Sequence, residues 1–268
     1  MLNVTVVQPP YYAGETPDAV IAEFLLKELN TVEEGGLIVL PEYSNAGGLS
    51  DAERERLALP RARAMLAKAS EIAKARRAYV VINVLEERDG KLRNSTYLFD
   101  RSGNVAFIYD KIHLPPSELD LDVTRGDGDC VCELDGLRFG FMTCYDVYFN
   151  EQIEFIAKHK PDIILIPGYQ RGERTDIICA QAKLTAFRCN AFVARSSYSM
   201  NDDEHGGNSM IVAPNGQILK NMGKEIGSVS ERIEPLQKHM RSAGFGGAMV
   251  RNDDFINNGL CPEAFQKG

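Results

Sequence analysis

The sequence contains no tryptophan, only four histidines and no pair of cysteines in a C-x-x-C arrangement. The missing C-x-x-C pair argues against a thiol redox site, which needs a resolving cysteine beside the reactive one. No apolar run approaches the roughly 20 residues that a helix needs to cross a bilayer. We therefore expect no membrane partner.

Basic residues are in deficit. The chain has 30 Lys and Arg against 38 Asp and Glu, a formal net charge of -8 and a sequence pI of about 5.2. A surface of this sign repels phosphate backbones, and no basic cluster offsets it. We expect no nucleic-acid partner.

The first residues, MLNVTVVQPPYYAG, lack the basic flank, long apolar core and cleavage site of a signal peptide, and they are predicted to form a strand. The six cysteines need not form disulfides, because a 268-residue chain can bury an adequate core without them. We expect reduced thiols and a cytoplasmic location.

Short apolar runs alternate with amphipathic stretches, which is typical of an α/β fold. The first predicted helix starts near Thr16 and stops at Gly35-Gly36, and the second opens with a capping box, Ser50 and Glu53, and continues to about Arg77. Two more helices are predicted at 151–160 and 174–189. Strands are predicted at 2–8, 36–41, 79–87, 94–100, 105–110, 138–143, 162–167, 191–197 and 209–213.

Turn sequences at 88–90 (Arg-Asp-Gly) and 102–104 (Ser-Gly-Asn) predict hairpins, so the sheet should be mixed and not purely parallel. No Pro- or Ser-rich linker divides the chain, and we assign residues 1–240 to one domain. Residues 241–268 are rich in Gly and Asn and weakly periodic. They are predicted to form an arm that packs on the domain or on a partner subunit.

Three reactive residues directly follow apolar strands: Glu42, Lys111 and Cys144. Active sites of α/β proteins collect at strand ends, where a rigid backbone aims side chains into a crevice. Each residue alone is equally typical of a solvated strand end or of a small buried thiol. Spacing alone does not show that the three meet.

Their local sequences add a resemblance. The segments Leu-Pro-Glu at 40–42, Tyr-Asp-Lys-Ile-His-Leu at 109–114 and Thr-Cys-Tyr-Asp at 143–146, with Glu151, resemble the three signature segments of the nitrilase-like carbon–nitrogen hydrolases, amidase-type branch. They occur in the family's order. Supporting matches, such as Asn94-Ser95 before the lysine strand, extend the resemblance over about residues 2–235.

The resemblance implies a four-layer α-β-β-α sandwich that forms a homodimer or a higher homo-oligomer, with no metal or organic cofactor. It implies that Cys144 attacks a small amide, that Glu42 acts as general base, and that Lys111 and the backbone N–H of Tyr145 stabilise the oxyanion. A thioester would then be hydrolysed to release an acid, after ammonia has left.

The family commonly has a second glutamate between the lysine and the cysteine, and Glu118 is the best match. A solvent-facing loop glutamate is an equally good interpretation of this residue. Glu133 is a poor alternative because it lies in the next predicted strand.

Two departures leave the substrate open. Tyr148 stands where many amidase members have arginine, and Asn150 stands where they have proline. N-carbamoyl amines or amino acids remain an alternative substrate class, as does a nitrile, although nitrile-hydrolysing members commonly have Trp at the position of Tyr145. A catalytically idle scaffold of the same fold is the non-enzyme alternative, and the intact triad argues against it.

Overall fold

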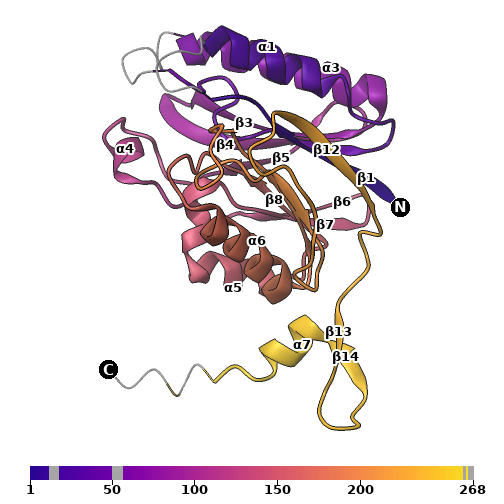
Figure 1. The fold of residues 1–268 in the computed structure, drawn as a ribbon. Helices are drawn as coiled ribbons and strands as arrows, with labels where there is room; N and C mark the ends of the chain where they lie inside the picture. The colour runs from indigo at the N-terminus through magenta and orange to yellow at the C-terminus, as the bar shows by residue number, and fades with distance from the viewer. Residues whose placement is uncertain (12–17, 50–56, 262–263, 265–268) are drawn as a thin grey trace.

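The computed structural model describes residues 1–11, 18–49, 57–261 and 264. Two six-stranded sheets pack face to face, and helices cover both outer faces (Figure 1). Helices α1 (Asp18–Leu29) and α3 (Leu59–Arg76) lie on the first sheet, whereas α5 (Asn150–Lys158) and α6 (Thr175–Cys189) lie on the second. The predicted four-layer α-β-β-α sandwich is confirmed.

The first sheet has the order β12-β1-β2-β3-β4-β5. Its strands β1, β2 and β3 are parallel, and β4, β5 and β12 add antiparallel neighbours, so the sheet is mixed as predicted. The bounds are Leu2–Gln8 for β1, Leu37–Val39 for β2, Tyr79–Arg88 for β3, Lys91–Phe99 for β4, Val105–Asp110 for β5 and Gly227–Ile233 for β12.

The second sheet has the order β11-β10-β9-β8-β7-β6. Its strands β7, β8 and β9 are parallel, with antiparallel strands on both sides. The bounds are Val131–Leu134 for β6, Leu137–Phe141 for β7, Ile163–Pro167 for β8, Phe192–Ser196 for β9, Met210–Val212 for β10 and Ile218–Asn221 for β11.

The central strands are apolar on both faces because each sheet is covered on both sides. All five residues of β8 are buried, and the rings of Tyr79 and Phe139 meet across the two sheets at 5.7 Å. A separate apolar cluster, which includes Leu25 and Met65, fills the space between the first sheet and its helices. The two sheets therefore form a rigid support for the loops at their edges.

Both predicted hairpins are present. Strands β3 and β4 are joined at Asp89 and Gly90, which have φ values of 54° and 68°. Two consecutive positive φ values are the geometry of a type I′ turn, which matches the twist of the flanking strands. The second hairpin joins β4 to β5 through Gly103, whose φ is 82°.

The sequence pattern located most central strands and missed several peripheral ones. Strands β1 and β5 have the predicted bounds, whereas β2 is shorter than predicted and α1 ends at Leu29, before the predicted stop at Gly35-Gly36. The predicted helix start at Thr16 and the capping box at Ser50 lie outside the described residues. Strands β11 and β12 were not predicted, because their residues are largely polar and partly exposed.

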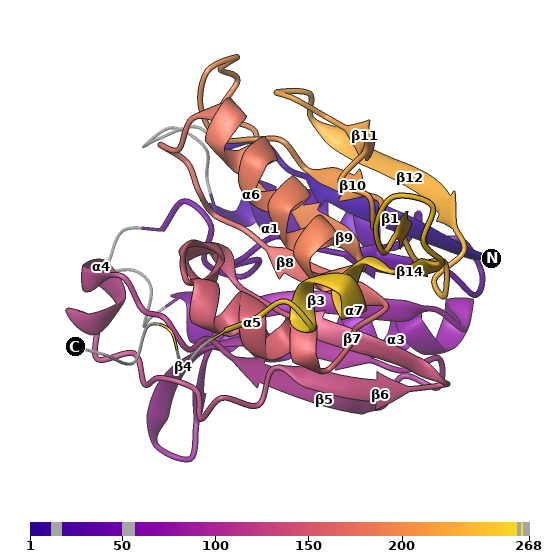
Figure 2. The same ribbon diagram turned by 90° about the horizontal axis from the view of Figure 1, so that it is seen from below.

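The segment after β12 leaves the body of the molecule (Figures 1 and 2). It contains β13 (Met240–Ser242), β14 (Met249–Arg251) and α7 (Asn252–Asn257), elements that its weak periodicity did not predict. Helix α7 returns to the end of α6, where Asn190 Nδ2 donates to Asp253 Oδ1 at 2.7 Å. Among the described residues, no helix is long and apolar enough to span a bilayer.

Candidate active site

The three reactive strand-end residues meet at one edge of the sandwich. Glu42 follows β2, Lys111 follows β5, and Cys144 follows β7 as the first residue of the 3-10 helix η2 (Cys144–Tyr148). Lys111 Nζ lies 2.7 Å from Glu42 Oε1, and the Cys144 thiol hydrogen-bonds to the Glu42 carboxylate. The packing of the two sheets thus brings a thiol, a carboxylate and an ammonium group into contact.

These side chains differ in accessibility. Glu42 is 1% exposed and Lys111 is 2% exposed, whereas Cys144 is only partly buried. The backbone N–H of Tyr169 also faces the sulfur of Cys144. A substrate therefore meets the thiol first, with the two charged groups beneath it.

Glu118 belongs to the same cluster. It lies on the short helix α4 (Pro116–Leu119), is 2% exposed, and its Oε2 atom lies 2.9 Å from Lys111 Nζ. The structure therefore places this side chain against the lysine, and the interpretation as a solvent-facing loop residue is wrong.

Gly126 lets the loop after α4 close on the end of β5. Its N–H donates to the Lys111 carbonyl at 2.9 Å, and a Cβ atom at this position would lie 2.1 Å from the Asp110 carbonyl oxygen. No side chain fits in that space. The close backbone contact fixes the loop that carries Glu118.

Asn94 connects the two glutamates. Its Nδ2 atom donates to Glu42 Oε1 at 2.8 Å and to Glu118 Oε1 at 2.7 Å, and Asn83 Nδ2 donates to its Oδ1 at 2.7 Å. The Tyr43 hydroxyl donates to Glu118 as well. The sequence analysis named Asn94 only as a supporting match, and its position next to Lys111 in the hairpin was the signal for a site residue.

A sharp turn presents the thiol. Cys144 has a φ of 47°, a left-handed conformation that is strained for a residue with a side chain. Asp146 holds this turn by accepting hydrogen bonds from Thr143 N at 2.7 Å, from the Tyr109 hydroxyl at 2.6 Å and from His113 N at 3.0 Å. Tyr145 is the second residue of η2, where backbone N–H groups have no acceptor inside the helix.

His113 ties the lysine segment to the cysteine segment. Its ring stacks on Phe149 at 3.8 Å between centroids, Nδ1 lies 2.9 Å from Asp146 Oδ1, and Nε2 lies 2.9 Å from Glu151 Oε1. The hydrogen bond to Asp146 raises the pKa of His113, against the opposing effect of burial, and Glu151 raises it further. The family-like His113 and Glu151 are thus structural partners beneath the turn.

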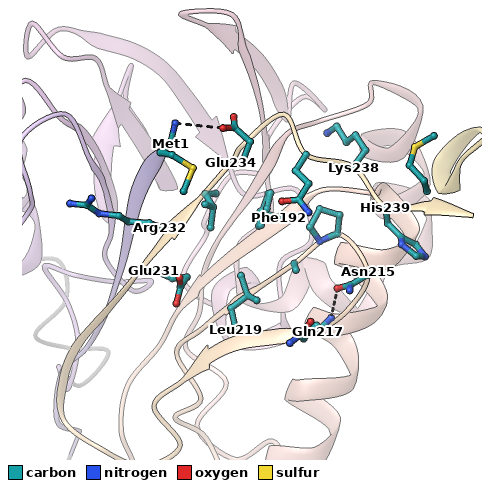
Figure 3. A pocket seen from close by; sticks show the side chains of 15 residues that line it. Met1, Phe192, Asn215, Gln217, Leu219, Glu231, Arg232, Glu234, Lys238 and His239 are labelled. Atoms are coloured by element: carbon teal, nitrogen blue, oxygen red, sulfur yellow. Dashed lines mark hydrogen bonds and ion pairs between the residues drawn. The ribbon is translucent and has the colours of Figure 1, made fainter.

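A groove of about 540 Å³ lies elsewhere, at the root of the C-terminal segment (Figure 3). Phe192, the first residue of β9, lines it, whereas the thiol lies at the opposite edge, where the parallel strands β7 and β9 end. The Met1 amino group lies 3.7 Å from Glu234 across its rim. None of the described residues that line it is a cysteine, serine or threonine, so it offers no nucleophile of the kind found at Cys144.

Comparison with known proteins agrees with this geometry. The model of the carbon-nitrogen hydrolase family matches residues 3–231. The chain belongs to this family. A 2-oxoglutaramate amidase from Bacillus subtilis is 27% identical over 217 residues, which cover 80% of this chain and 83% of that protein. An omega-amidase from Homo sapiens is 28% identical over 186 residues, which cover 62% and 65% of the two chains.

A solved structure of an amidase of the nitrilase superfamily from Nesterenkonia matches the fold with a TM-score of 0.76 at 18% identity. The match covers 99% of this chain and 95% of that one. This carbon–nitrogen hydrolase is therefore an enzyme that acts on C–N bonds other than peptide bonds, and its relatives support an amidase. The predicted family and enzyme class are confirmed.

Charges at the site of this hydrolase are strongly coupled. Burial raises the pKa of Glu42, Lys111 lowers it, Glu118 raises it again, and the net shift is upward. Burial alone would lower the pKa of Lys111, but Glu42, Cys144 and Glu118 together raise it. Burial and Glu42 raise the pKa of Cys144, against Lys111. The resting site therefore holds a charged lysine and a protonated thiol beside a carboxylate of increased basicity.

Proposed function

We propose that this enzyme hydrolyses the C–N bond of a small carboxamide to a carboxylic acid and ammonia, with Cys144 as nucleophile. One observation carries the proposal: the Cys144 thiol hydrogen-bonds to Glu42, whose carboxylate is 2.7 Å from Lys111 Nζ. A nucleophile next to a base that is itself oriented by a third group is the arrangement that covalent catalysis requires.

In the first step, Glu42 takes the thiol proton while Cys144 Sγ forms a bond to the amide carbon. The raised pKa of Glu42 suits this role, because a general base works best when its pKa lies near the operating pH. The carbonyl oxygen becomes an oxyanion, and Lys111 and the N–H of Tyr145 stabilise it.

In the second step, the tetrahedral intermediate collapses. Glu42 returns the proton to the departing nitrogen, the C–N bond breaks, and ammonia leaves a thioester on Cys144. Glu42 then removes a proton from water, which attacks the thioester and releases the acid with the regenerated thiol. Glu118 supports both steps by holding Lys111 from the other side at 2.9 Å.

Relatives support the same chemistry. The Bacillus subtilis and human relatives are amidases by name, and one structure of the Nesterenkonia amidase shows covalent addition of the acetamide moiety of fluoroacetamide at its active-site cysteine. We infer an equivalent covalent intermediate at Cys144.

The test is ammonia release from a panel of aliphatic amides, ω-amides, N-carbamoyl compounds and nitriles, with Cys144→Ala protein as the blank. We expect kcat/KM for an amide to exceed that for the nitrile of the same acyl group. Lys111 and the Tyr145 N–H suit an oxyanion, whereas a thioimidate nitrogen must be protonated. Faster nitrile hydrolysis would replace the amidase by a nitrilase, and faster release from N-carbamoyl compounds would favour that alternative class. Absence of turnover on the whole panel would support the scaffold.

A further inference from the structure

A buried arginine lies close to the proposed nucleophile without a charged partner. Arg195 is on β9 and is only 2% exposed. Its Nη1 atom donates to the carbonyls of Gly207 at 2.7 Å and Asn208 at 2.8 Å, and its Nη2 atom donates to Gln170 Oε1 at 3.1 Å. All three acceptors are neutral.

The positive charge of Arg195 is therefore uncompensated. Among the residues that the structure describes, no carboxylate acts on it: the groups that interact with its charge are Cys144, Cys179 and Tyr148. Burial lowers the pKa of Arg195 to about 10. Buried charges in proteins are normally paired, so an unpaired one requires an explanation.

The guanidinium group also retains free donors. Arginine has five N–H donors, and three are used here. The buried Nε atom has no hydrogen-bond partner, and one hydrogen of Nη2 is free as well. A group that presents both a charge and unused donors is suited to a carboxylate, which accepts through two oxygens.

The position of Arg195 relates it to the reacting thiol. Cys144 is the first of the groups that interact with its charge. The segment from Gly168 to Gln170 connects the two: Tyr169 N–H faces the Cys144 sulfur, and Gln170 Oε1 accepts from Arg195. Gly168 has no side chain, and a Cβ atom there would lie 3.4 Å from Arg195 Nη2.

Gln170 continues this layer toward the turn that carries the nucleophile. Its Nε2 atom donates to the Tyr148 hydroxyl at 3.3 Å and to Gln181 Oε1 at 3.0 Å. Tyr148 occupies the position where many amidase members have an arginine. This chain therefore supplies its positive charge from β9 and not from η2.

A purely structural role does not account for the charge. A neutral donor such as glutamine could hold the carbonyls of Gly207 and Asn208 without the desolvation of a cation. Lys111 already provides the positive charge next to the Cys144 sulfur. The charge of Arg195 is explained if its partner arrives with the substrate.

We propose that Arg195 binds a carboxylate of the substrate, so that the preferred substrates are amides with a carboxylate at the end remote from the scissile bond. The inference rests on the proposed amidase function of Cys144. It assigns the substrate class and makes Arg195 a specificity-determining residue.

The test compares two substrate series in the full-length enzyme. One series consists of the monoamides of dicarboxylic acids with two to four methylene groups, and the other consists of unbranched alkyl amides of the same lengths. We expect the unmodified enzyme to prefer a monoamide in kcat/KM. Arg195→Met should reduce that preference by about 30-fold or more, mainly through KM, because truncation of one partner of a buried charge pair has an effect of this size. Arg195→Lys should retain part of the preference.

Arg171 provides the matched control. It is an exposed arginine of the same loop, with its guanidinium over the rings of Tyr11 and Tyr169. Arg171→Met should leave the preference between the two series unchanged. Loss of the preference in Arg171→Met but not in Arg195→Met would overturn the assignment.

Other outcomes are also decisive. Equal turnover of both series by the unmodified enzyme would refute the carboxylate site but leave the amidase function intact, whereas no turnover of either series would refute the amidase function itself. If Arg195→Met does not fold, competition in the unmodified enzyme decides the question. Inhibition of alkyl amide hydrolysis by the dicarboxylate itself, but not by the neutral diol of equal length, is expected, and equal behaviour of the two would overturn the proposal.

Discussion

Lys111 Nζ lies 2.7 Å from Glu42 Oε1, and both side chains are almost completely buried. A second carboxylate, Glu118, approaches the same ammonium group at 2.9 Å. The lysine therefore compensates two buried acids at once. Its removal affects the stability of the fold as well as the chemistry.

Lys111→Met should destabilise the protein by about 3–5 kcal/mol, the usual effect of leaving a buried charge without its partner. The loss should be greater at high pH. The pKa of Glu42 is raised in the folded state, so protonated Glu42 favours folding below its ordinary pKa, and this contribution disappears as the pH rises through the folded-state pKa. Urea unfolding at pH 5 and pH 8 measures the difference.

The control for this variant is Lys68→Met. Lys68 forms an exposed ion pair with Glu71 at 2.8 Å, and such pairs contribute about 0–1 kcal/mol. The two lysine variants should therefore differ clearly in the free energy of unfolding. Equal stability of both would show that Lys111 does not compensate the buried carboxylates.

Cys144→Ala should abolish ammonia release while it keeps the fold, because the thiol makes the proposed covalent bond to substrate. Removal of a catalytic nucleophile lowers kcat by a factor on the order of 10⁶ in a well-characterised serine hydrolase. Cys261→Ala, at an exposed cysteine, should retain activity. Circular dichroism checks the fold of both variants, and turnover by folded Cys144→Ala protein would contradict the mechanism.

His113→Gln should destabilise the enzyme more at low pH than at high pH. The hydrogen bonds to Asp146 and Glu151 raise the pKa of His113, so the charged ring stabilises the folded state below its ordinary pKa of about 6.5. This stabilisation is lost as the pH rises through the higher pKa of the folded state. Unfolding free energies between pH 5 and pH 9 should converge for the two proteins, and a difference that is independent of pH would exclude the charged ring.

The triad segments could be located from the sequence because they follow buried apolar strands. Such strands have a clear pattern, and their ends lie where the sheets expose side chains to a crevice. Strand β12 was missed because its sequence, GSVSERI, alternates with polar residues at the edge of the sheet. Strands β13 and β14 have three residues each, too short for any periodicity.

Arg195 could not be assigned from the sequence, although a charged residue inside the apolar run AFVARSS was visible. Its partners Gln170, Gly207 and Asn208 come from loops, whose conformations leave no periodic signal. The placement of Glu118 depended in the same way on backbone contact between Gly126 and the end of β5. Contacts between distant loops required coordinates.

The enzyme should be at least a dimer in solution, with the outer face of α5 and α6 as the interface. Figure 2 shows these helices on the outside of the sandwich. Three large apolar side chains are exposed there: Phe155 is 44% exposed, Ile177 is 40% exposed and Leu184 is 59% exposed. Leu184→Glu would place a charge in an apolar contact, and it should shift the mass toward that of one chain.

The matched control is Val20→Glu, because Val20 is 47% exposed on α1, in the opposite helical layer. This variant should keep the mass of the unmodified enzyme. Light scattering at micromolar concentration measures all three proteins against the chain mass of 29.7 kDa. A monodisperse mass near 29.7 kDa for the unmodified enzyme would exclude the dimer. An oligomer that survives Leu184→Glu but dissociates in Val20→Glu would move the interface to the other layer.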